Sequence, residues 1–250
     1  METLYFSEIA ILSVACIIAY FPKGFSGFGP APVFIPTVAV LWSPSLALTS
    51  SAFIDLFVGL FLILSLNFYK NDLSKILKMS FFVGIGTFIG AGFVGIISEN
   101  LLRLIIGFFV FLFGLSFLSP AKFDLKIPKK YTSKFLFIGC ILGGFTGGLV
   151  GISGPFIVVA CRPLMDKSEF RRILVAVFWI EGILKIIAYS TVGVWDADVY
   201  KLAAIATPAI LAGLFIGFKS HFRVNEKSFS LIVGIILLII AINTIISTLR

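Results

Sequence analysis

Two glycine- and proline-rich stretches carry the strongest indication of the fold: KGFSGFGPAP at residues 23–32 and GGFTGGLVGISGP at residues 143–155. A shift by about half the chain length places Gly24 on Gly148 and Gly27 on Gly151. Each stretch is followed by a short apolar run. Glycine permits backbone bends and close approach, and self-similarity at a fixed spacing indicates internal duplication. The pattern therefore predicts two related halves.

The composition is that of a membrane protein. Hydrophobic residues make up 59% of the 250 residues, charged residues 13%, and the mean hydropathy is +1.12, far from the balance of soluble domains. Disorder is excluded, a disulfide scaffold is excluded by three separated cysteines, and a single histidine disfavours a zinc or copper site. Long unbroken apolar runs indicate helices, because a β-barrel alternates polar and apolar residues. The predicted class is an all-α polytopic membrane protein.

Apolar segments of about 20 residues, long enough to cross a bilayer as a helix, recur along the chain. Seven candidates are residues 4–21, 45–66, 77–98, 100–118, 171–192, 199–218 and 228–248. Shorter apolar pieces at 31–42, 134–143 and 155–164 flank the glycine-rich stretches. The first segment is not typical of a cleaved signal peptide, since its head carries Glu2 and Glu8 and no basic residue.

The predicted organisation is a first transmembrane repeat at 1–118, a basic cytoplasmic linker at 119–133 and a second repeat at 134–250, together one transport domain. Most of the 20 lysines and arginines lie in loops that share one side of the membrane if the N-terminus is outside. This positive-inside pattern accounts for the net charge of +8 without a nucleic-acid partner. Both termini are then expected outside the inner membrane, and the repeats are inverted, as in many secondary transporters.

The charge pattern leaves the path of the glycine-rich hairpins open. Each hairpin either crosses fully, giving ten crossings, or is broken and re-entrant, giving six full spans and two hairpins that meet near the midplane. In either case a glycine break followed by proline fits a helix N-terminus, where free N–H groups and the positive end of the helix dipole attract anions.

The glycine-rich stretches are therefore candidates for a substrate site, with hydroxyl groups as additional donors. The candidate substrate-binding residues are Gly24, Ser26, Gly27, Gly29, Thr146, Gly148, Gly151, Ser153 and Gly154. The alternative is that these glycines only permit close helix packing. Gly107 and Gly234, in the last segment of each repeat, are expected to tolerate alanine.

Three ionisable residues lie within predicted spans: Asp55, Glu181 and Lys185. A charge inside the membrane is costly, so each is a candidate for proton coupling or, for Lys185, for attracting an anion. The alternative is structural: an i,i+4 pair of Glu181 with Lys185, and Asp55 bonded to nearby serines such as Ser50. The sequence shows no catalytic constellation, no metal ligands and no cofactor motif.

The glycine motifs make the sequence similar to the TauE/SafE family. The first half supplies Gly24, Gly27, Gly29 and Ile35-Pro36, the second Gly147, Gly148, Gly151 and Gly154. The resemblance covers nearly the whole chain. It implies two homologous halves and export of sulfite or related organosulfur anions.

These observations predict a secondary transporter, not an enzyme. The expected substrate is a small anion such as sulfite, an organosulfonate or a related organic acid, moved by alternating access with coupling to the proton gradient or membrane potential. The expected partners are that substrate and the lipid bilayer. A passive anion channel and a membrane anchor subunit that transports nothing are the alternatives.

Overall fold

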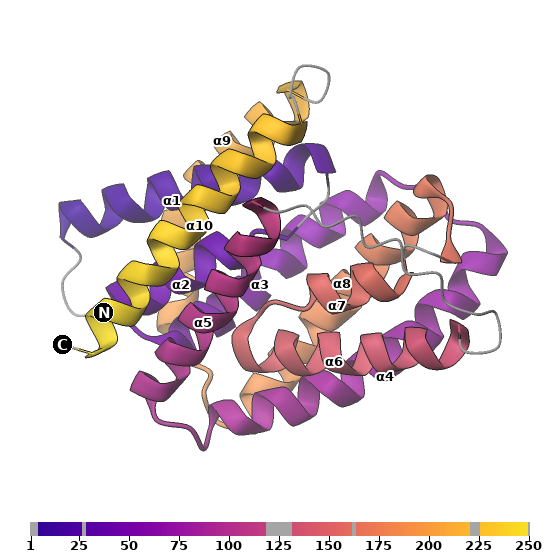
Figure 1. Ribbon diagram of the computed structural model, residues 1–250, viewed down its shortest axis with the longest axis horizontal. Helices are drawn as coiled ribbons and strands as arrows, with labels where there is room; N and C mark the ends of the chain where they lie inside the picture. Colours follow the sequence, from indigo (N-terminus) through magenta and orange to yellow (C-terminus); the bar gives the residue numbers. More distant parts are fainter. Residues whose placement is uncertain (1–4, 27–28, 119–131, 162–163, 221–225, 250) are drawn as a thin grey trace. The chain divides into compact units, whose positions relative to one another are not determined.

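The computed structural model describes residues 5–26, 29–118, 132–161, 164–220 and 226–249. Within these ranges the chain forms ten α-helices and no strand (Figure 1). The helices are α1 (Phe6–Ser26), α2 (Ala31–Leu41), α3 (Pro44–Leu64), α4 (Lys70–Val94), α5 (Glu99–Leu118), α6 (Thr132–Val150), α7 (Gly154–Cys161), α8 (Lys167–Thr191), α9 (Asp198–Ser220) and α10 (Glu226–Leu249).

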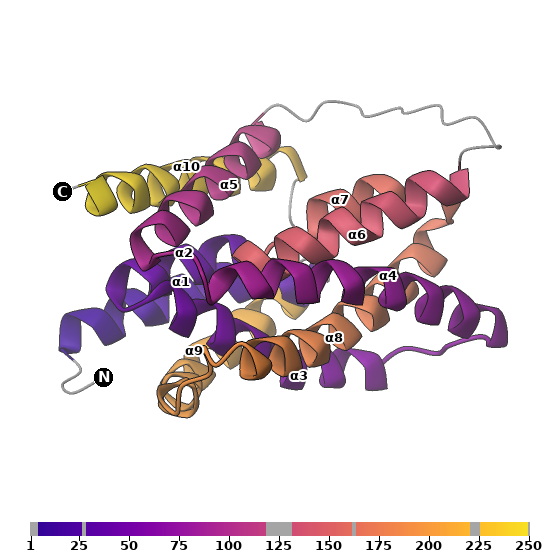
Figure 2. The same ribbon diagram turned by 90° about the horizontal axis from the view of Figure 1, so that it is seen from below.

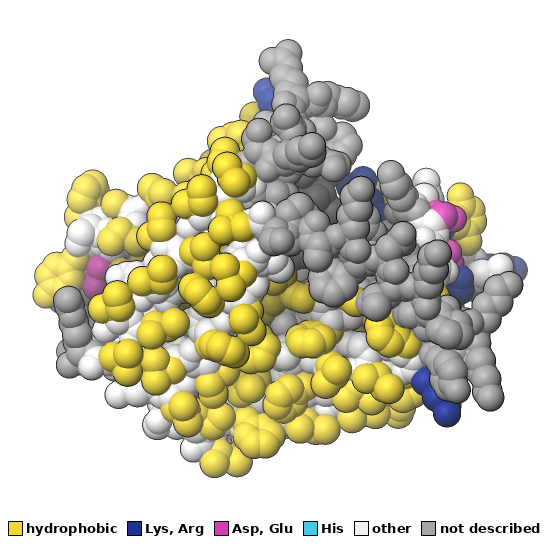
Figure 3. Space-filling model, in the orientation of Figure 1, with side chains coloured by type: hydrophobic (Ala, Val, Ile, Leu, Met, Phe, Trp, Pro, Cys, Tyr) yellow, Lys and Arg dark blue, Asp and Glu magenta, His cyan; other side chains and the backbone are white. Residues whose placement is uncertain are grey.

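Eight of these helices are long and apolar enough to span a membrane, and α2 and α7 are the short ones. The predicted all-α, multi-pass membrane class is confirmed. Apolar side chains are spread over the described part of the face in Figure 3. Side chains such as Phe61 (62% exposed), Phe81 (65%) and Ile239 (62%) point outward. Large apolar groups in this position are suited to contact with lipid tails rather than water.

The glycine-rich stretches are more helical than the sequence predicts. The piece expected at 134–143 continues as α6 through three further glycines to Val150, and α1 continues past the expected end at residue 21 to Ser26. The expected break shrinks to residues 151–153 in the second stretch. Close helix packing explains the difference, because it stabilises glycine in a helix against its poor intrinsic propensity.

The chain divides into two compact units. The first comprises Met1–Ser51, Ile97–Lys122 and Trp195–Arg250, and the second Ala52–Ile96 and Phe123–Val194. Each unit therefore draws helices from both halves of the sequence. The division into repeats at 1–118 and 134–250 rests on sequence similarity and stays a prediction. Of the linker, residues 119–131 lie outside the described residues.

In the first unit, α1 packs along α9 and α5 along α10, with α2 against α1, α5 and α10. Figure 2 shows α5 and α10 side by side, as does Figure 1. Gly213 faces Ile17 and Gly217 faces Phe21, one turn further along both helices, so α1 and α9 run parallel. Arg103 of α5 donates from Nε to the carbonyl oxygen of Ala39 at 2.8 Å. It thereby provides a hydrogen-bond donor for a carbonyl group in the last turn of α2.

The contact between α5 and α10 includes Gly107 and Gly234, where the sequence predicts that alanine is tolerated. A Cβ at Gly107 would lie 2.9 Å from Cγ1 of Ile245, and one at Gly234 would lie 3.1 Å from the carbonyl oxygen of Gly114. Alanine at either position would require these neighbours to shift slightly, and the expected tolerance of alanine there stays a prediction. Alanine is better accommodated at Gly92 of α4, where an added Cβ would have no neighbouring atom within 4 Å.

In the second unit, α4 is the central helix and packs along both α6 and α8. Gly144 lies against Val83 and Gly148 against Thr87, so α4 and α6 run parallel with their backbones in close approach. Added Cβ atoms at Gly86 and Gly144 would collide with backbone of the facing helix. This is the small-residue packing by which helices associate in membranes, where the hydrophobic effect between helices is absent.

Candidate functional site

The second glycine-rich stretch ends in a tight turn between α6 and α7. Gly151 has a φ of +78°, a left-handed conformation that side chains penalise. Ser153 follows, and α7 begins at Gly154 with Pro155 in its first turn, where the missing N–H and fixed φ of proline are suited. The turn therefore places Ser153 directly before the N-terminus of α7.

Ser153 forms a hydrogen bond with the ion pair of Glu181 and Lys185 on α8. Its Oγ donates to Oε2 of Glu181 at 2.8 Å, and Nζ of Lys185 lies 2.9 Å from Oε1 of the same carboxylate. Glu181 is 1% exposed, Ser153 7%, and the side chain of Lys185 13%. The structure thus joins residues that the sequence placed in two separate hypotheses. We call Ser153, Glu181 and Lys185 the α8 site.

The two oxygens of the Glu181 carboxylate are not equally satisfied. Oε2 accepts a well-directed hydrogen bond from Ser153. Oε1 is close to the Lys185 ammonium, but among the described residues it accepts no hydrogen bond of good geometry. The 2.9 Å separation of the opposite charges is attractive even at an angle that is unfavourable for a hydrogen bond. The Glu181–Lys185 pair is therefore stabilised mainly by electrostatic attraction and not by a well-directed hydrogen bond.

The glycines of this stretch have different roles. An added Cβ at Gly147 would collide with the Glu181 carboxylate and lie 2.9 Å from Cβ of Ser153, so Gly147 makes room for the α8 site. Gly148 instead faces the backbone of α4 at Thr87. The hydroxyl of Thr146 donates to carbonyls one turn earlier in its own helix, and not to the α8 site.

Sequence reasoning missed Tyr189, a buried residue of α8. Its hydroxyl donates to the carbonyl of Gly148 at 2.9 Å. The signal was present in the spacing, because Glu181, Lys185 and Tyr189 are four residues apart and share one face of a helix. The sequence alone does not indicate a role for this tyrosine, because the carbonyl group of Gly148 that faces it belongs to another helix.

Trp179 fixes α8 against the later part of α3. Its indole Nε1 donates to the carbonyl of Leu56 at 3.0 Å, and Gly59 leaves space for the ring, since an added Cβ there would lie 2.8 Å from Cδ1 of Trp179. Asp55, a neighbour on α3, is half-buried. Its suggested partner Ser50 donates to the carbonyl of Leu46 in its own helix.

The first glycine-rich stretch is described in part. Gly24 lies in α1 against α9, where an added Cβ would be 2.6 Å from the carbonyl oxygen of Leu214, whereas Gly29 is open. Gly27 and the side chain of Ser26 lie outside the described residues. Lys23 is buried at 7% exposure, with Nζ 5.7 Å from the ring centroid of Tyr20. The roles of Gly24, Ser26, Gly27 and Gly29 in substrate binding stay predictions.

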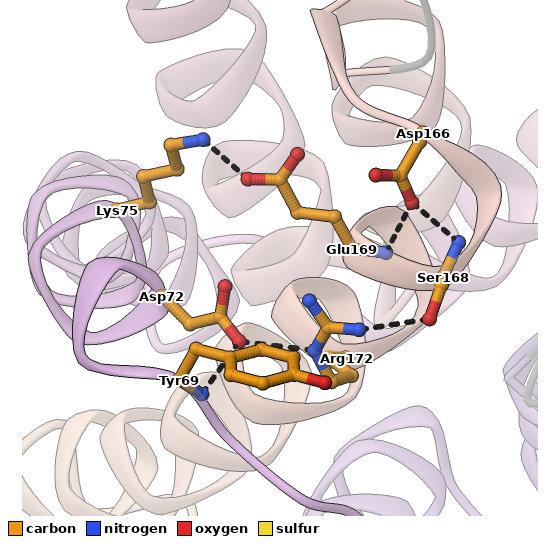
Figure 4. A network of polar contacts seen from close by, with 7 residues as sticks. All are labelled: Tyr69, Asp72, Lys75, Asp166, Ser168, Glu169 and Arg172. Atoms are coloured by element: carbon orange, nitrogen blue, oxygen red, sulfur yellow. Dashed lines mark hydrogen bonds and ion pairs between the residues drawn. The ribbon is translucent and has the colours of Figure 1, made fainter.

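A second polar cluster lies where the N-terminal ends of α4 and α8 meet, and we call it the end network (Figure 4). Nε of Arg172 donates to Oδ2 of Asp72 at 3.0 Å, and Nη1 donates to Ser168 at 2.8 Å. The guanidinium also stacks 4.7 Å from the ring centroid of Tyr69, whose backbone N–H donates to Asp72. Arg172 is one of the basic residues for which the sequence predicts only a loop position, because its acidic partner Asp72 lies on a helix 100 residues away in the sequence.

The outer part of the end network is more exposed. Lys75 forms an ion pair with Glu169, and their side chains are 47% and 19% exposed. The Asp166 carboxylate caps α8 by accepting from the N–H groups of Ser168 and Glu169 at 2.9 Å. In the described part of the chain, no group of three His, Cys, Asp or Glu side chains is placed to hold a metal ion.

Comparison with known proteins identifies the family. The sequence profile described as "Sulfite exporter TauE/SafE" matches residues 12–244. The chain belongs to the TauE/SafE family. The resemblance read from the glycine motifs is thereby confirmed. TauE/SafE proteins are membrane exporters, so the expectation that the chain is not an enzyme is confirmed as well.

A curated relative in the TauE/SafE family is the probable sulfite/organosulfonate exporter TauE of Cupriavidus necator. It is 28% identical over 145 residues, which cover 55% of this chain and 55% of the relative. The match thus spans about half the length of the relative. No solved structure matches this TauE/SafE chain.

Proposed function

We propose that this chain is a secondary transporter that exports a small anion, namely sulfite, an organosulfonate or a related small organic acid. The observation that carries the proposal is the α8 site: a buried carboxylate, ammonium and hydroxyl at the N-terminus of a short helix within a membrane protein. Family membership supports the exporter class. Ionisable groups inside a membrane are rare, and they mark substrate and ion pathways or proton relays.

The proposed mechanism follows from the charges. While Glu181 is ionised, it holds Lys185 and the Ser153 hydroxyl. A proton on Glu181 removes the negative charge, so the ammonium and the hydroxyl become donors for an oxygen of the substrate anion. The free N–H groups of the first turn of α7 add favourable dipoles. Proton loading and anion binding are thereby coupled at one site, so alternating access would carry the proton and the anion in the same direction.

Within the second stretch, we propose that Gly151, Ser153 and Gly154 line the substrate position and that Gly147 accommodates the carboxylate. The contacts of Gly148 and Gly24 with facing backbones favour packing roles for these two. The equivalents Ser26, Gly27 and Gly29 remain candidates in the first stretch. Asp55 remains a candidate for proton coupling.

We also propose the inverted two-repeat topology, with both termini outside the inner membrane. Two features support it. α4, α6 and α8 run parallel, as do α1 and α9, while α5 and α10 run antiparallel, as ten segments crossing in alternation require. In addition, the first helix of each half packs on the fourth helix of the other half, as α1 with α9 and α6 with α4.

Topology is tested by single cysteines at Lys126 and Ser247. The native thiols Cys16, Cys140 and Cys161 are buried, so their background labelling is low. Membrane-impermeant reagent applied from outside is expected to label position 247 and not position 126. Labelling of both positions from one face would contradict the inverted arrangement.

Transport is tested in proteoliposomes with radiolabelled sulfite. A carrier shows saturable flux and counterflow, a passive channel shows flux without counterflow, and an anchor subunit shows neither. Competition by sulfonates and small carboxylates then ranks the substrates. Lys201→Gln is the matched control: it removes a 2.8 Å pair with Asp198 on α9 in which the lysine side chain is 65% exposed, and it should transport as the parent does.

Proton coupling is tested with Glu181→Gln and Asp55→Asn, which keep side-chain shape and remove the titratable group. The variant that lacks the coupling acid should lose uptake driven by a pH gradient while retaining exchange. If both variants keep parental gradient-driven uptake, the two acids have structural roles and the coupling proposal fails.

A further inference from the structure

The hydroxyl of Tyr189 connects α8 to the last turn of α6. Tyr189 is fully buried, and its oxygen lies 2.9 Å from the carbonyl oxygen of Gly148 and 3.5 Å from that of Gly147. Since α6 ends at Val150, these carbonyls belong to the turn whose C=O groups lack partners within the helix. A buried carbonyl without a partner is destabilising, and the tyrosine removes that cost.

The turn into α7 is thus anchored to α8 at both ends. Before the turn, Gly148 is held by Tyr189; after it, Ser153 is held by Glu181. Between these anchors lies Gly151 with its positive φ, the most deformable residue of the segment. Both anchors stand on one face of α8, so the location of the Ser153 hydroxyl depends on the two contacts together.

We propose that Tyr189 is a positioning residue for anion binding. It acts through the turn: by holding Gly148, it keeps the Ser153 hydroxyl at the distance where Glu181, and then the substrate anion, accepts its hydrogen bond. The inference rests on the proposed function, because it assumes that the anion binds at the α8 site. The Tyr189 hydroxyl itself donates to the backbone carbonyl of Gly148, so its proposed role is exerted through the turn.

The test uses Tyr189→Phe in proteoliposomes with radiolabelled sulfite. Phenylalanine keeps the ring and removes the donor. The KM for sulfite should rise about fivefold, the loss expected from one neutral hydrogen bond, with a maximal rate near that of the parent. The matched control is Tyr200→Phe on α9, where the side chain is 54% exposed and the KM should be parental.

A double variant separates positioning from general support of the fold. If Tyr189 acts through Ser153, then Tyr189→Phe added to Ser153→Ala raises the KM no further than Ser153→Ala alone. Additive effects, or a parental KM in Tyr189→Phe while Ser153→Ala is impaired, would overturn this inference and leave the proposed function intact. Absence of saturable sulfite flux in the parent would overturn the proposed function and this inference with it.

A second measurement keeps the hydroxyl in place and applies even if Tyr189→Phe does not fold. In the parent carrying 3-fluorotyrosine at position 189, the fluorine resonance should shift on saturation with sulfite, because Ser153 changes partner and the turn responds. The same label at position 200 should not shift. An unchanged resonance at position 189 under saturating sulfite would overturn the positioning role.

Discussion

The two polar clusters on α8 differ in how completely their charges are satisfied. In the end network, Arg172 donates to two acceptors and stacks on a ring, and Asp72 accepts from a side chain and from the backbone. At the α8 site, Oε1 of Glu181 has the nearby Lys185 ammonium but, among the described residues, no well-directed hydrogen bond. Both clusters include residues of α8, but the charged groups of the end network have well-directed hydrogen bonds and one oxygen of Glu181 at the α8 site does not.

This difference in hydrogen bonding indicates that the two clusters on α8 have different roles, one in the stability of the fold and the other in transport. A fully bonded cluster holds two helices in register and has little reason to exchange partners. A buried pair held mainly by charge can exchange one partner for another with smaller loss, which is what binding and release of an anion require. We therefore expect mutations at the α8 site to act on transport and mutations in the end network to act on stability.

The largest effect is expected when both charges of the α8 site are removed together, in Glu181→Gln with Lys185→Met. Transport of sulfite should fall about 100-fold, since charged hydrogen bonds contribute about 1.5–3 kcal/mol each and every 1.4 kcal/mol is tenfold. Because neither partner is left buried and unpaired, the melting temperature should stay near that of the parent. Flux and thermal unfolding are measured on the same preparation. Parental transport by the double variant would remove the distinction between the clusters.

A smaller effect is expected at the turn that carries Ser153. Gly151→Ala places a side chain at a φ of +78°, which costs about 1–2 kcal/mol, and it displaces the hydroxyl from Glu181. Affinity for sulfite, measured by calorimetry, should fall about tenfold. The control is Gly92→Ala, where open space and better helix propensity predict unchanged affinity and equal or higher stability. Equal affinities in the two variants would show that the turn does not position the site.

The end network should give the reverse result. Arg172→Met leaves the Asp72 carboxylate, whose side chain is 4% exposed, without its main partner. The melting temperature is expected to fall by a few degrees, while the KM for sulfite in the folded fraction stays parental. A raised KM with unchanged melting would place the end network in the transport pathway and contradict the comparison.

The smallest effect is expected for Lys75→Gln at the outer edge of the end network. The pair with Glu169 is largely solvated on the lysine side, and such pairs contribute little. Both the melting temperature and the KM should be indistinguishable from the parent. A clear loss of stability would mean that the network is cooperative beyond its buried pair.

Much of the α8 site was within reach of sequence reasoning. The i,i+4 spacing predicts that Glu181 and Lys185 can pair, and the pair forms with a separation of 2.9 Å. The glycine-proline pattern marked the turn at Gly151 and the start of α7, although the helix before it is longer than expected. Which glycines pack and which make room was not predictable, because Gly147 and Gly148 differ only in the helix that each one faces.

By itself, the sequence determined the class of the protein, the apolar segments, the place of the turn at Gly151 and the spacing that allows Glu181 and Lys185 to pair. These follow from composition and from the fixed periodicity of a helix, which are properties of neighbouring residues. Only the tertiary structure decided that Ser153 bonds to Glu181, that Tyr189 holds the end of α6 and that Arg172 pairs with Asp72. Such contacts depend on the register between packed helices, and that register is set by the close approach of glycine-lined backbones rather than by any short stretch of sequence.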